Sequence, residues 1–353
     1  MPGEHWGAGE HGGAGDGPRV CVLGAGSWGT TLASLAAAGH PTVVWARDPT
    51  LAAEIGKAHL NSRYLAGFTL PACLRATDSL AEALDGADVV VVGVPSEGFR
   101  EVLELAAPHL SAPHPAEPVP VVSVSKGFEG GTLMRMTEVI AAVLPGHPAA
   151  TLSGPNLAGE IMGGKAAASV VACSEPAVAL ALQELFGVGM FRVYTNHDVI
   201  GVEVGGALKN VIAIAAGIGE GLGAGDNSRA AVIARGLAEV TRLGTAMGGD
   251  PATFAGLAGL GDLLATCMSP LSRNRHVGLE LGRGRALSEI LAGMTEVAEG
   301  VHTAGVVMAL ARRHGVEMPI CEQVAGVVTG ITSVSEAYRN LLRVPPGHER
   351  EPY

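Results

Sequence analysis

The 353-residue chain has no basic excess, few aromatic residues and no closely spaced cysteines. Its 23 Lys and Arg residues against 34 Asp and Glu residues give a formal net charge of −11, which argues against binding of bulk DNA or RNA. Aromatic residues make up only 4 %, so the core must consist mainly of Ala, Val, Leu and Ile. Because 48 % of the residues are hydrophobic, the chain can still bury a large core. At roughly 150 residues per domain, we expect two domains.

The cysteines are too few and too scattered for a disulfide framework or a zinc site. There are five of them, an odd number, and none belongs to a Cys-x-x-Cys pair: Cys21, Cys73, Cys173, Cys267 and Cys321. The histidines also lack the close spacing of metal ligands. We therefore expect free thiols in a reducing cytoplasm and no bound metal.

No segment of the sequence is typical of a membrane anchor. The N-terminus has no basic start followed by an apolar run, so we expect no signal peptide. Residues 20–46 contain no charged side chain, but four glycines and a proline interrupt them, and we interpret them as strand, helix and strand rather than a membrane span. Residues 1–17 and 344–353 have no apolar periodicity, and we expect a disordered extension and a loose tail.

Residues 18–196 alternate short β-branched runs with helical stretches, such as DSLAEALDGA from residue 78 and TLMRMTEVIAAVLPG from residue 132. The expected strands are RVCVLGA from residue 19, PTVVWAR from 41, and the ranges 87–95, 120–127, 149–155, 168–173 and 191–196. From residue 197 to 343 the strand signals disappear and every long segment has a helical pattern. The sequence therefore predicts an α/β protein: an N-terminal domain with a parallel, doubly wound, Rossmann-type sheet, followed by an all-helical C-terminal domain.

A glycine-rich loop joins the first expected strand to the first helix. Its sequence, Gly24-Ala25-Gly26-Ser27-Trp28-Gly29, has the spacing and the strand–helix context of a dinucleotide-binding loop. Gly24 allows the tight turn, Gly26 lets the backbone approach a pyrophosphate, and Gly29 allows close packing of helix on strand. Helix N–H groups and the helix dipole would then face the phosphates.

The end of the second expected strand indicates which dinucleotide is bound. An NAD site often carries an acidic residue there for the ribose 2′-hydroxyl, whereas this chain has Arg47 followed by Asp48. Arginine pairs with a 2′-phosphate and stacks on adenine, so Arg47 favours NADP. Asp48 keeps NAD as the alternative. The loop at the end of the expected strand 87–95, at Pro95, either contacts the cofactor or only ends its strand.

Lysine is scarce, and two of the four lysines have unusual surroundings. Lys126 follows a strand, at the edge of the sheet where ligands bind. Lys209 lies in a nearly uncharged helical segment, with apolar neighbours at Ile212 and Ala213. A lysine buried there would have a lowered pKa and could act as a general base or acid; alternatively, its side chain extends to solvent.

Seven segments occur in an order that closely resembles the bacterial NAD(P)-dependent sn-glycerol-3-phosphate dehydrogenases. They are GAGSWGT, VVVVGVPS, SVSKGFE, LSGPNLAGEI, VEVGGALKNVIAIAAGIGEGLG, GLAGLGDLLATCMSPLSRNRHVG and TEVAEGVHTA, and the resemblance covers about residues 19–340. It implies interconversion of sn-glycerol 3-phosphate, a small phosphorylated three-carbon substrate, and dihydroxyacetone phosphate. It also implies a supply of glycerol phosphate for phospholipid synthesis.

The resemblance also implies roles for individual residues. Lys209 would be the catalytic proton acceptor. The substrate would contact Lys126, Gly154, Asn156, Lys209, Asp262, Ser272, Arg273 and Asn274. The cofactor would contact Ser27, Trp28, Arg47, Tyr64, Lys126, Ala158, Arg273, Val297 and Glu299, in addition to the loop glycines. Asn156 departs from the family, in which Ser or Thr is more usual at this position.

Some of these residues could have a purely structural role, and related enzymes remain as alternatives. Asp262 could cap a helix and the SRNR segment could be a solvated turn. The whole chain could be a β-hydroxy-acid or ketopantoate-type reductase, which also uses a helical lysine, or a non-catalytic NADP-sensing protein. The phosphate-suited Arg273 and Asn274 favour the glycerol phosphate enzyme. We further expect a homodimer, the commonest oligomer.

Overall fold

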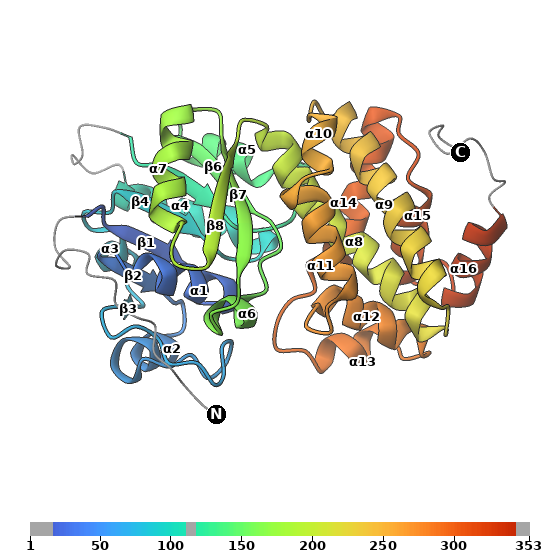
Figure 1. The fold of residues 1–353 in the computed structure, drawn as a ribbon, viewed down its shortest axis with the longest axis horizontal. Helices are drawn as coiled ribbons and strands as arrows, with labels where there is room; N and C mark the ends of the chain where they lie inside the picture. Colours follow the sequence, from blue (N-terminus) through green and yellow to red (C-terminus); the bar gives the residue numbers. More distant parts are fainter. Residues whose placement is uncertain (1–16, 111–117, 344–353) are drawn as a thin grey trace.

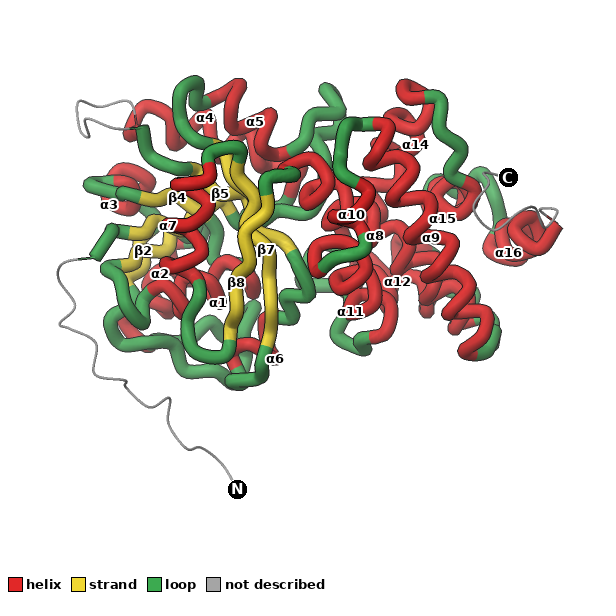
Figure 2. The backbone as a smooth tube through the Cα atoms, turned by 45° about the horizontal axis from the view of Figure 1, so that its top comes forward, coloured by secondary structure: helices red, strands yellow, loops and turns green. Residues whose placement is uncertain are grey.

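The computed structural model describes residues 17–110 and 118–343 of the chain, which form two bodies of different construction. One contains a sheet with helices on both faces, and the other contains only helices (Figure 1). Figure 2 separates them by colour, because all strands lie in the first body. The expected extension at 1–17, apart from Gly17, and the expected tail at 344–353 lie outside the described residues.

The first body is built on a single eight-stranded sheet in the described residues, with the order β3-β2-β1-β4-β5-β6-β7-β8. Its strands are β1 (Val20–Leu23), β2 (Thr42–Trp45), β3 (Arg75–Thr77), β4 (Val89–Val92), β5 (Val121–Ser123), β6 (Ala149–Ser153), β7 (Ala167–Cys173) and β8 (Phe191–Asn196). Its helices are α1 (Ser27–Ala36), α2 (Pro49–Ala53), α3 (Leu80–Leu84), α4 (Phe99–Leu110), α5 (Met136–Val143), α6 (Ala158–Met162) and α7 (Pro176–Phe186), with short turns η1 (Glu54–Ala58) and η2 (Ser96–Gly98).

This architecture confirms the predicted Rossmann-type sheet, with three differences. The short β3 was not expected. The antiparallel pairing of β6 with β7, in which Ala150 lies opposite Cys173, departs from the all-parallel sheet that we expected. The helix expected from Thr132 begins only at Met136, because Leu133 has a left-handed backbone, with φ of 65°.

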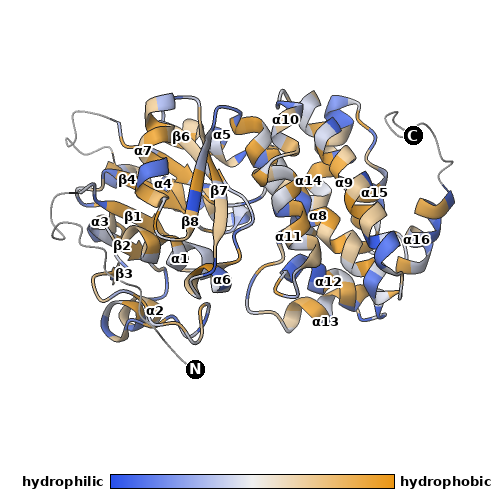
Figure 3. Cartoon of the chain, viewed as in Figure 1, coloured by the Kyte–Doolittle hydropathy of each residue, from blue (hydrophilic) through white to orange (hydrophobic). Residues whose placement is uncertain are grey.

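The alternation of strand side chains divides the sheet core into two layers. Val20 and Val22 pack with α1, α2 and α7 on one face. Cys21 and Leu23, the residues between and after them, pack with α3, α4 and α5 on the other. Both faces are therefore apolar, as Figure 3 shows by the orange strands between helices, and this explains why the strand sequences are continuous hydrophobic runs.

The second body packs around one long helix, α8 (Val199–Gly221). The other helices are α9 (Asp226–Ala246), α10 (Pro251–Phe254), α11 (Asp262–Met268), α12 (Arg273–Gly282), α13 (Leu287–Ala292), α14 (Glu299–His314), α15 (Pro319–Val328) and α16 (Val334–Arg343), with a π-turn η3 (Leu257–Gly261). By length and composition alone, α8 and the segment Pro251–Met268 are apolar enough to span a membrane. However, 89 % of the apolar window of α8 is buried inside the protein, as expected for a core helix, and Pro251–Met268 is divided at the extended Gly256.

Helix α8 is anchored to the sheet body by a buried carboxylate. Glu203 accepts hydrogen bonds from the backbone N–H of Thr137 at 2.9 Å and from the Arg135 guanidinium at 2.6 Å, at the start of α5. Burial raises the pKa of Glu203, while Arg135 and Thr137 act against that increase. Because Lys209 lies on the same helix, this contact fixes Lys209 relative to the sheet.

Helices α8 and α12 are in main-chain contact through glycines. A Cβ on Gly278 would lie 2.0 Å from the carbonyl oxygen of Ile214, and a Cβ on Gly217 would lie 2.1 Å from that of Arg275. Neither position can accept a side chain unless the helices separate, because the obstructing atoms belong to the backbone. These contacts hold the beginning of α12 close to α8.

Replacing Gly278 with alanine is expected to lower the free energy of unfolding by about 2 kcal/mol, since the added methyl group overpacks the contact with α8. Gly305 on α14 is the matched control, because nothing lies within 4 Å of the position of its Cβ. Gly305→Ala should instead stabilise the helix by about 0.5–1 kcal/mol. Urea denaturation of both variants measures the difference, and equal stability would show that the two helices can separate at no cost.

Candidate active site

A cleft of about 770 Å³ lies between the two bodies. Strands β1, β2, β4, β5 and β6 are parallel, so their carboxyl ends meet at one edge of the sheet, and the loops after them carry Gly24, Arg47, Pro95, Lys126 and Asn156. Residues of α8 and the beginning of α12 line the opposite wall. This is the position at which doubly wound sheets bind their ligands.

The glycine-rich loop at the end of β1 has the geometry that a dinucleotide requires. Gly24 has φ of +115°, and a Cβ on Gly29 would lie 2.1 Å from the carbonyl oxygen of Gly24. The space beside Gly26 is open. Helix α1 begins there without a side-chain cap and without an acidic residue in its first turn. Its free N–H groups therefore fit an anionic pyrophosphate.

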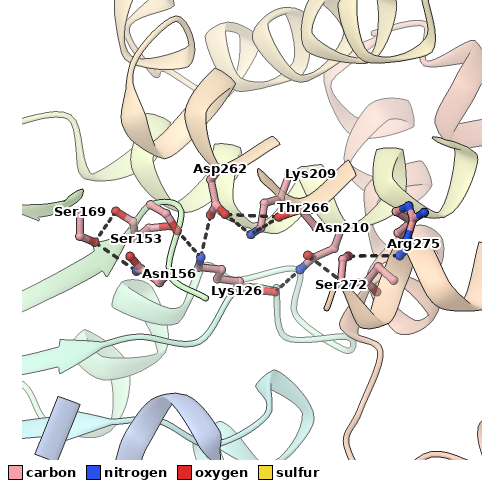
Figure 4. A network of polar contacts seen from close by, with 12 residues as sticks. Lys126, Ser153, Asn156, Ser169, Lys209, Asn210, Asp262, Thr266, Ser272 and Arg275 are labelled. Atoms are coloured by element: carbon pink, nitrogen blue, oxygen red, sulfur yellow. Dashed lines mark hydrogen bonds and ion pairs between the residues drawn. The ribbon is translucent and has the colours of Figure 1, made fainter. Parts of the chain in front are cut away.

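Two lysines and one carboxylate form a buried cluster at the other end of the cleft (Figure 4). Lys126, from the sheet body, donates from Nζ to Asp262 Oδ2 at 2.6 Å and to the carbonyl oxygen of Gly154 at 2.8 Å. Lys209, from α8, donates to Asp262 Oδ1 and to Thr266 Oγ1, the latter at 2.8 Å. Asp262 therefore joins the two bodies through the charges of both lysines.

Lys209 does not extend to solvent, because only 6 % of its surface is exposed. Burial lowers the pKa of Lys209 to about 7, Asp262 acts against this decrease, and the Lys126 ammonium adds to it. An amine with this pKa exists in both protonation states near neutral pH. It has the property of a general acid or base whose pKa matches the pH at which it works.

An amide chain connects the lysines to the beginning of α12. Asn210, next to Lys209, donates to the carbonyl oxygen of Lys126 at 3.4 Å and accepts from Asn274 at 3.0 Å. Asn274 in turn accepts from the N–H of Gly300 at 2.9 Å. Ser272 caps α12 by accepting from the N–H of Arg275. The N-terminus of α12 thus faces the cleft and presents donors suited to a phosphate.

Arg273 and Glu299 line the cleft from the side of the helical body. Arg273 pairs with Glu296 at 3.1 Å and donates to the carbonyl oxygen of Val297 at 2.9 Å. Glu299 accepts from the hydroxyl of Ser96 at 2.8 Å, so it links the helical body to the loop after β4. Burial raises the pKa of Glu299, while the bonds from Ser96 and the charge of Arg273 oppose this.

Comparisons with known proteins identify the family of the chain, and the matches cover nearly its whole length. Residues 19–179 and 198–339 match the family models for the N-terminus and the C-terminus of NAD-dependent glycerol-3-phosphate dehydrogenase. The chain belongs to this family. It is 55 % identical to a glycerol-3-phosphate dehydrogenase [NAD(P)+] of Sphingopyxis alaskensis, over 95 % of this chain and 99 % of that one.

Two other relatives agree. A glycerol-3-phosphate dehydrogenase [NAD(P)+] of Mycobacterium tuberculosis strain H37Rv is 53 % identical over 94 % of this chain and 96 % of its own. The crystal structure of the Coxiella burnetii glycerol-3-phosphate dehydrogenase superposes with a TM-score of 0.88, at 37 % identity, and covers 92 % of this chain and 99 % of that one. The resemblance stated from the sequence is therefore confirmed at the level of the family and the fold.

Most of the site residues expected in this glycerol-3-phosphate dehydrogenase line the cleft. They are Gly24, Gly26, Ser27, Trp28, Gly29, Arg47, Tyr64, Lys126, Asn156, Lys209, Ser272, Arg273, Asn274, Val297 and Glu299. Three do not line it: Asp262 and Gly154 lie behind the lysines that they bind, and Ala158 begins α6 beside the cleft-lining Leu157. Asp262 does not cap α11, so the purely structural role considered for it from the sequence is wrong.

Two residues at the centre of the site were missed by the sequence reasoning. Thr266 follows Asp262 by four positions, and helical spacing already places both on one face. Asn210 follows Lys209 directly, yet it turns to Asn274 and the sheet body. Asn156 donates to Ser169 at 3.1 Å, and its buried Oδ1 has no hydrogen-bond partner among the described residues.

Proposed function

We propose that this glycerol-3-phosphate dehydrogenase interconverts sn-glycerol 3-phosphate and dihydroxyacetone phosphate with Lys209 as the general base and acid. The observation that carries this assignment is a buried lysine with a pKa of about 7 that lines the cleft and is bound by Asp262. When bound, NAD(P) accepts the hydride from the carbon that bears the secondary hydroxyl, or returns it.

The proton steps follow from the two forms of Lys209. In oxidation, the neutral amine accepts the proton of the secondary hydroxyl. In reduction, the ammonium donates a proton to the oxygen that develops negative charge. Lys126 adds positive charge near that oxygen, and Asp262 keeps both Nζ atoms oriented toward the reacting group.

The remaining residues hold the two ligands. Arg273, Asn274 and the N-terminus of α12 suit the dianionic phosphate of the substrate, with Gly154, Asn156 and Ser272 beside it. The glycine-rich loop, Ser27 and Trp28 suit the cofactor pyrophosphate, and Arg47 and Tyr64 suit its adenosine end. Val297 and Glu299 complete the cofactor wall, and Ala158 lies next to the cleft-lining Leu157 on the cofactor side. On this assignment, residues 18–196 bind the cofactor and residues 197–343 complete the substrate site.

The two reaction directions are expected to have opposite pH dependences. Since burial lowers the pKa of Lys209 to about 7, the ammonium is lost above that pH, and kcat/KM for dihydroxyacetone phosphate should fall about tenfold per pH unit. Oxidation needs the neutral amine, so kcat/KM for glycerol 3-phosphate should rise with pH up to about 7 and then level off. Profiles with the same slope in both directions would contradict the role of Lys209.

The reaction itself is tested by the absorbance of the reduced cofactor at 340 nm. Oxidation of NADPH or NADH is expected on adding dihydroxyacetone phosphate, and the ratio of the two rates gives the cofactor preference. If both cofactors bind and neither is oxidised, the β-hydroxy-acid or ketopantoate-type reductases and the non-catalytic sensor become the better assignments.

The cellular setting belongs to the same proposal. The cysteines of the described chain are all free, which suits a reducing cytoplasm. The net charge of −11 gives no support for nucleic acid as a partner. A homodimer is the proposed assembly, and its mass in solution tests it. The product would supply glycerol phosphate for phospholipid synthesis.

A further inference from the structure

Asp48, at the adenosine end of the cleft, has both carboxylate oxygens engaged within the protein. Its Oδ1 accepts from the backbone N–H of Thr50 at 2.9 Å and caps α2. Its Oδ2 faces the guanidinium of Arg63 at 3.4 Å. A ribose 2′-hydroxyl would have to share this carboxylate with Thr50 and Arg63, although the end of β2 is where NAD sites often have such an acid.

Arg63 is the second cation at this end of the cleft. Its guanidinium lies 5.4 Å from the centre of the Tyr64 ring, and Arg63, Tyr64, Arg47 and Asp48 all line the same space. Arg47 pairs only loosely with Glu101, at 3.6 Å, and both of these side chains are exposed. Two guanidinium groups therefore lie beside one cleft, each held by a single weak carboxylate contact.

We propose that Arg63 is a specificity-determining residue that, with Arg47, binds the 2′-phosphate of NADP, and that Asp48 holds Arg63 at the cleft until the phosphate replaces it. The proposal rests on the proposed function, in which this cleft binds NAD(P). A phosphate monoester carries about −1.5 to −2 charges at pH 7 and offers three acceptor oxygens, so it competes well with one exposed carboxylate. The planar guanidinium fits that phosphate in two-point contact.

The test compares Arg63→Gln with Arg75→Gln. Arg75 is the matched control, because it forms a similar exposed pair with Glu82, at 3.2 Å, outside the cleft. Affinities for NADPH and NADH are measured by nicotinamide fluorescence without substrate, and 2′,5′-ADP is measured by calorimetry. Arg63→Gln should weaken NADPH and 2′,5′-ADP about tenfold, the low end for a charge-assisted hydrogen bond, and leave NADH within twofold. Arg75→Gln should change none of them.

A second variant tests the role of Asp48. Asp48→Asn keeps a side chain that can cap α2 but removes the negative charge beside the phosphate, so the affinity for 2′,5′-ADP should increase several-fold. Equal losses of NADPH and NADH in Arg63→Gln, or unchanged binding of 2′,5′-ADP, would overturn the proposal. If the wild-type protein binds neither dinucleotide, the proposed function itself fails, which is a distinguishable result.

Discussion

Replacing Lys209 with methionine is expected to lower kcat by about 1,000-fold, because it removes the proposed proton donor and acceptor of the reaction. Methionine has the unbranched shape of lysine without the terminal amine and is apolar, so it suits a position where Lys209 is only 6 % exposed. Steady-state kinetics in both directions measure the loss. Cofactor binding should persist, since the glycine-rich loop is untouched.

Lys165 provides the control for this substitution. Its side chain is 66 % exposed and pairs with Glu160 on the surface, so Lys165→Met should keep full activity. Retained turnover in Lys209→Met, with a normal pH profile, would contradict the assignment. Loss of activity together with loss of NADPH binding would show a folding defect rather than missing chemistry, and thermal unfolding distinguishes the two.

Asp262→Asn is expected to lower kcat/KM for dihydroxyacetone phosphate by about 100-fold at pH 7. The side chain keeps its size but loses the charge that offsets two buried ammonium groups. Because Asp262 acts against the decrease in the pKa of Lys209, its removal should move that pKa below 7. The loss in the reduction direction should therefore be smaller at acidic pH than at neutral pH.

Thr266→Val separates the effect of charge from that of position. It removes the other hydrogen-bond partner of Lys209 while keeping the shape of the side chain and leaving Asp262 in place. This variant should lower kcat without moving the pH profile. If Asp262→Asn and Thr266→Val change the rate but neither shifts the profile, the carboxylate acts only by orienting the lysine.

Much of the fold follows from local sequence patterns. Runs such as ADVVVVGVP form buried strands because both faces of the sheet are covered, and glycine spacing identifies the loop after β1. The antiparallel direction of β7 could not be predicted, since Ala167–Cys173 reads equally well in either direction. The start of α5 at Met136 was missed because the left-handed Leu133 leaves no mark in a sequence rich in helix-forming residues.

In the candidate site, too, local sequence patterns predicted some residues and not others. The glycines and Lys209 could be selected from the chemistry of single segments. The bond between Lys126 and Asp262 joins residues 136 positions apart, and no local pattern encodes it. Resemblance to a family placed both residues at the substrate without predicting that bond, and it gave no role to Arg63, whose place beside Asp48 depends on how the chain turns after η1.

The glycine contacts between α8 and α12 set the distance between two helices that line the cleft. Main-chain atoms have no rotamers, so these contacts fix the spacing between α8, which carries Lys209, and the beginning of α12. Helices α8 and α12 therefore form one rigid unit. This unit joins the sheet body through residues 197–198, through the bonds of Glu203 to Arg135 and Thr137, and through the contact of Ser96 with Glu299, so these junctions set the width of the cleft.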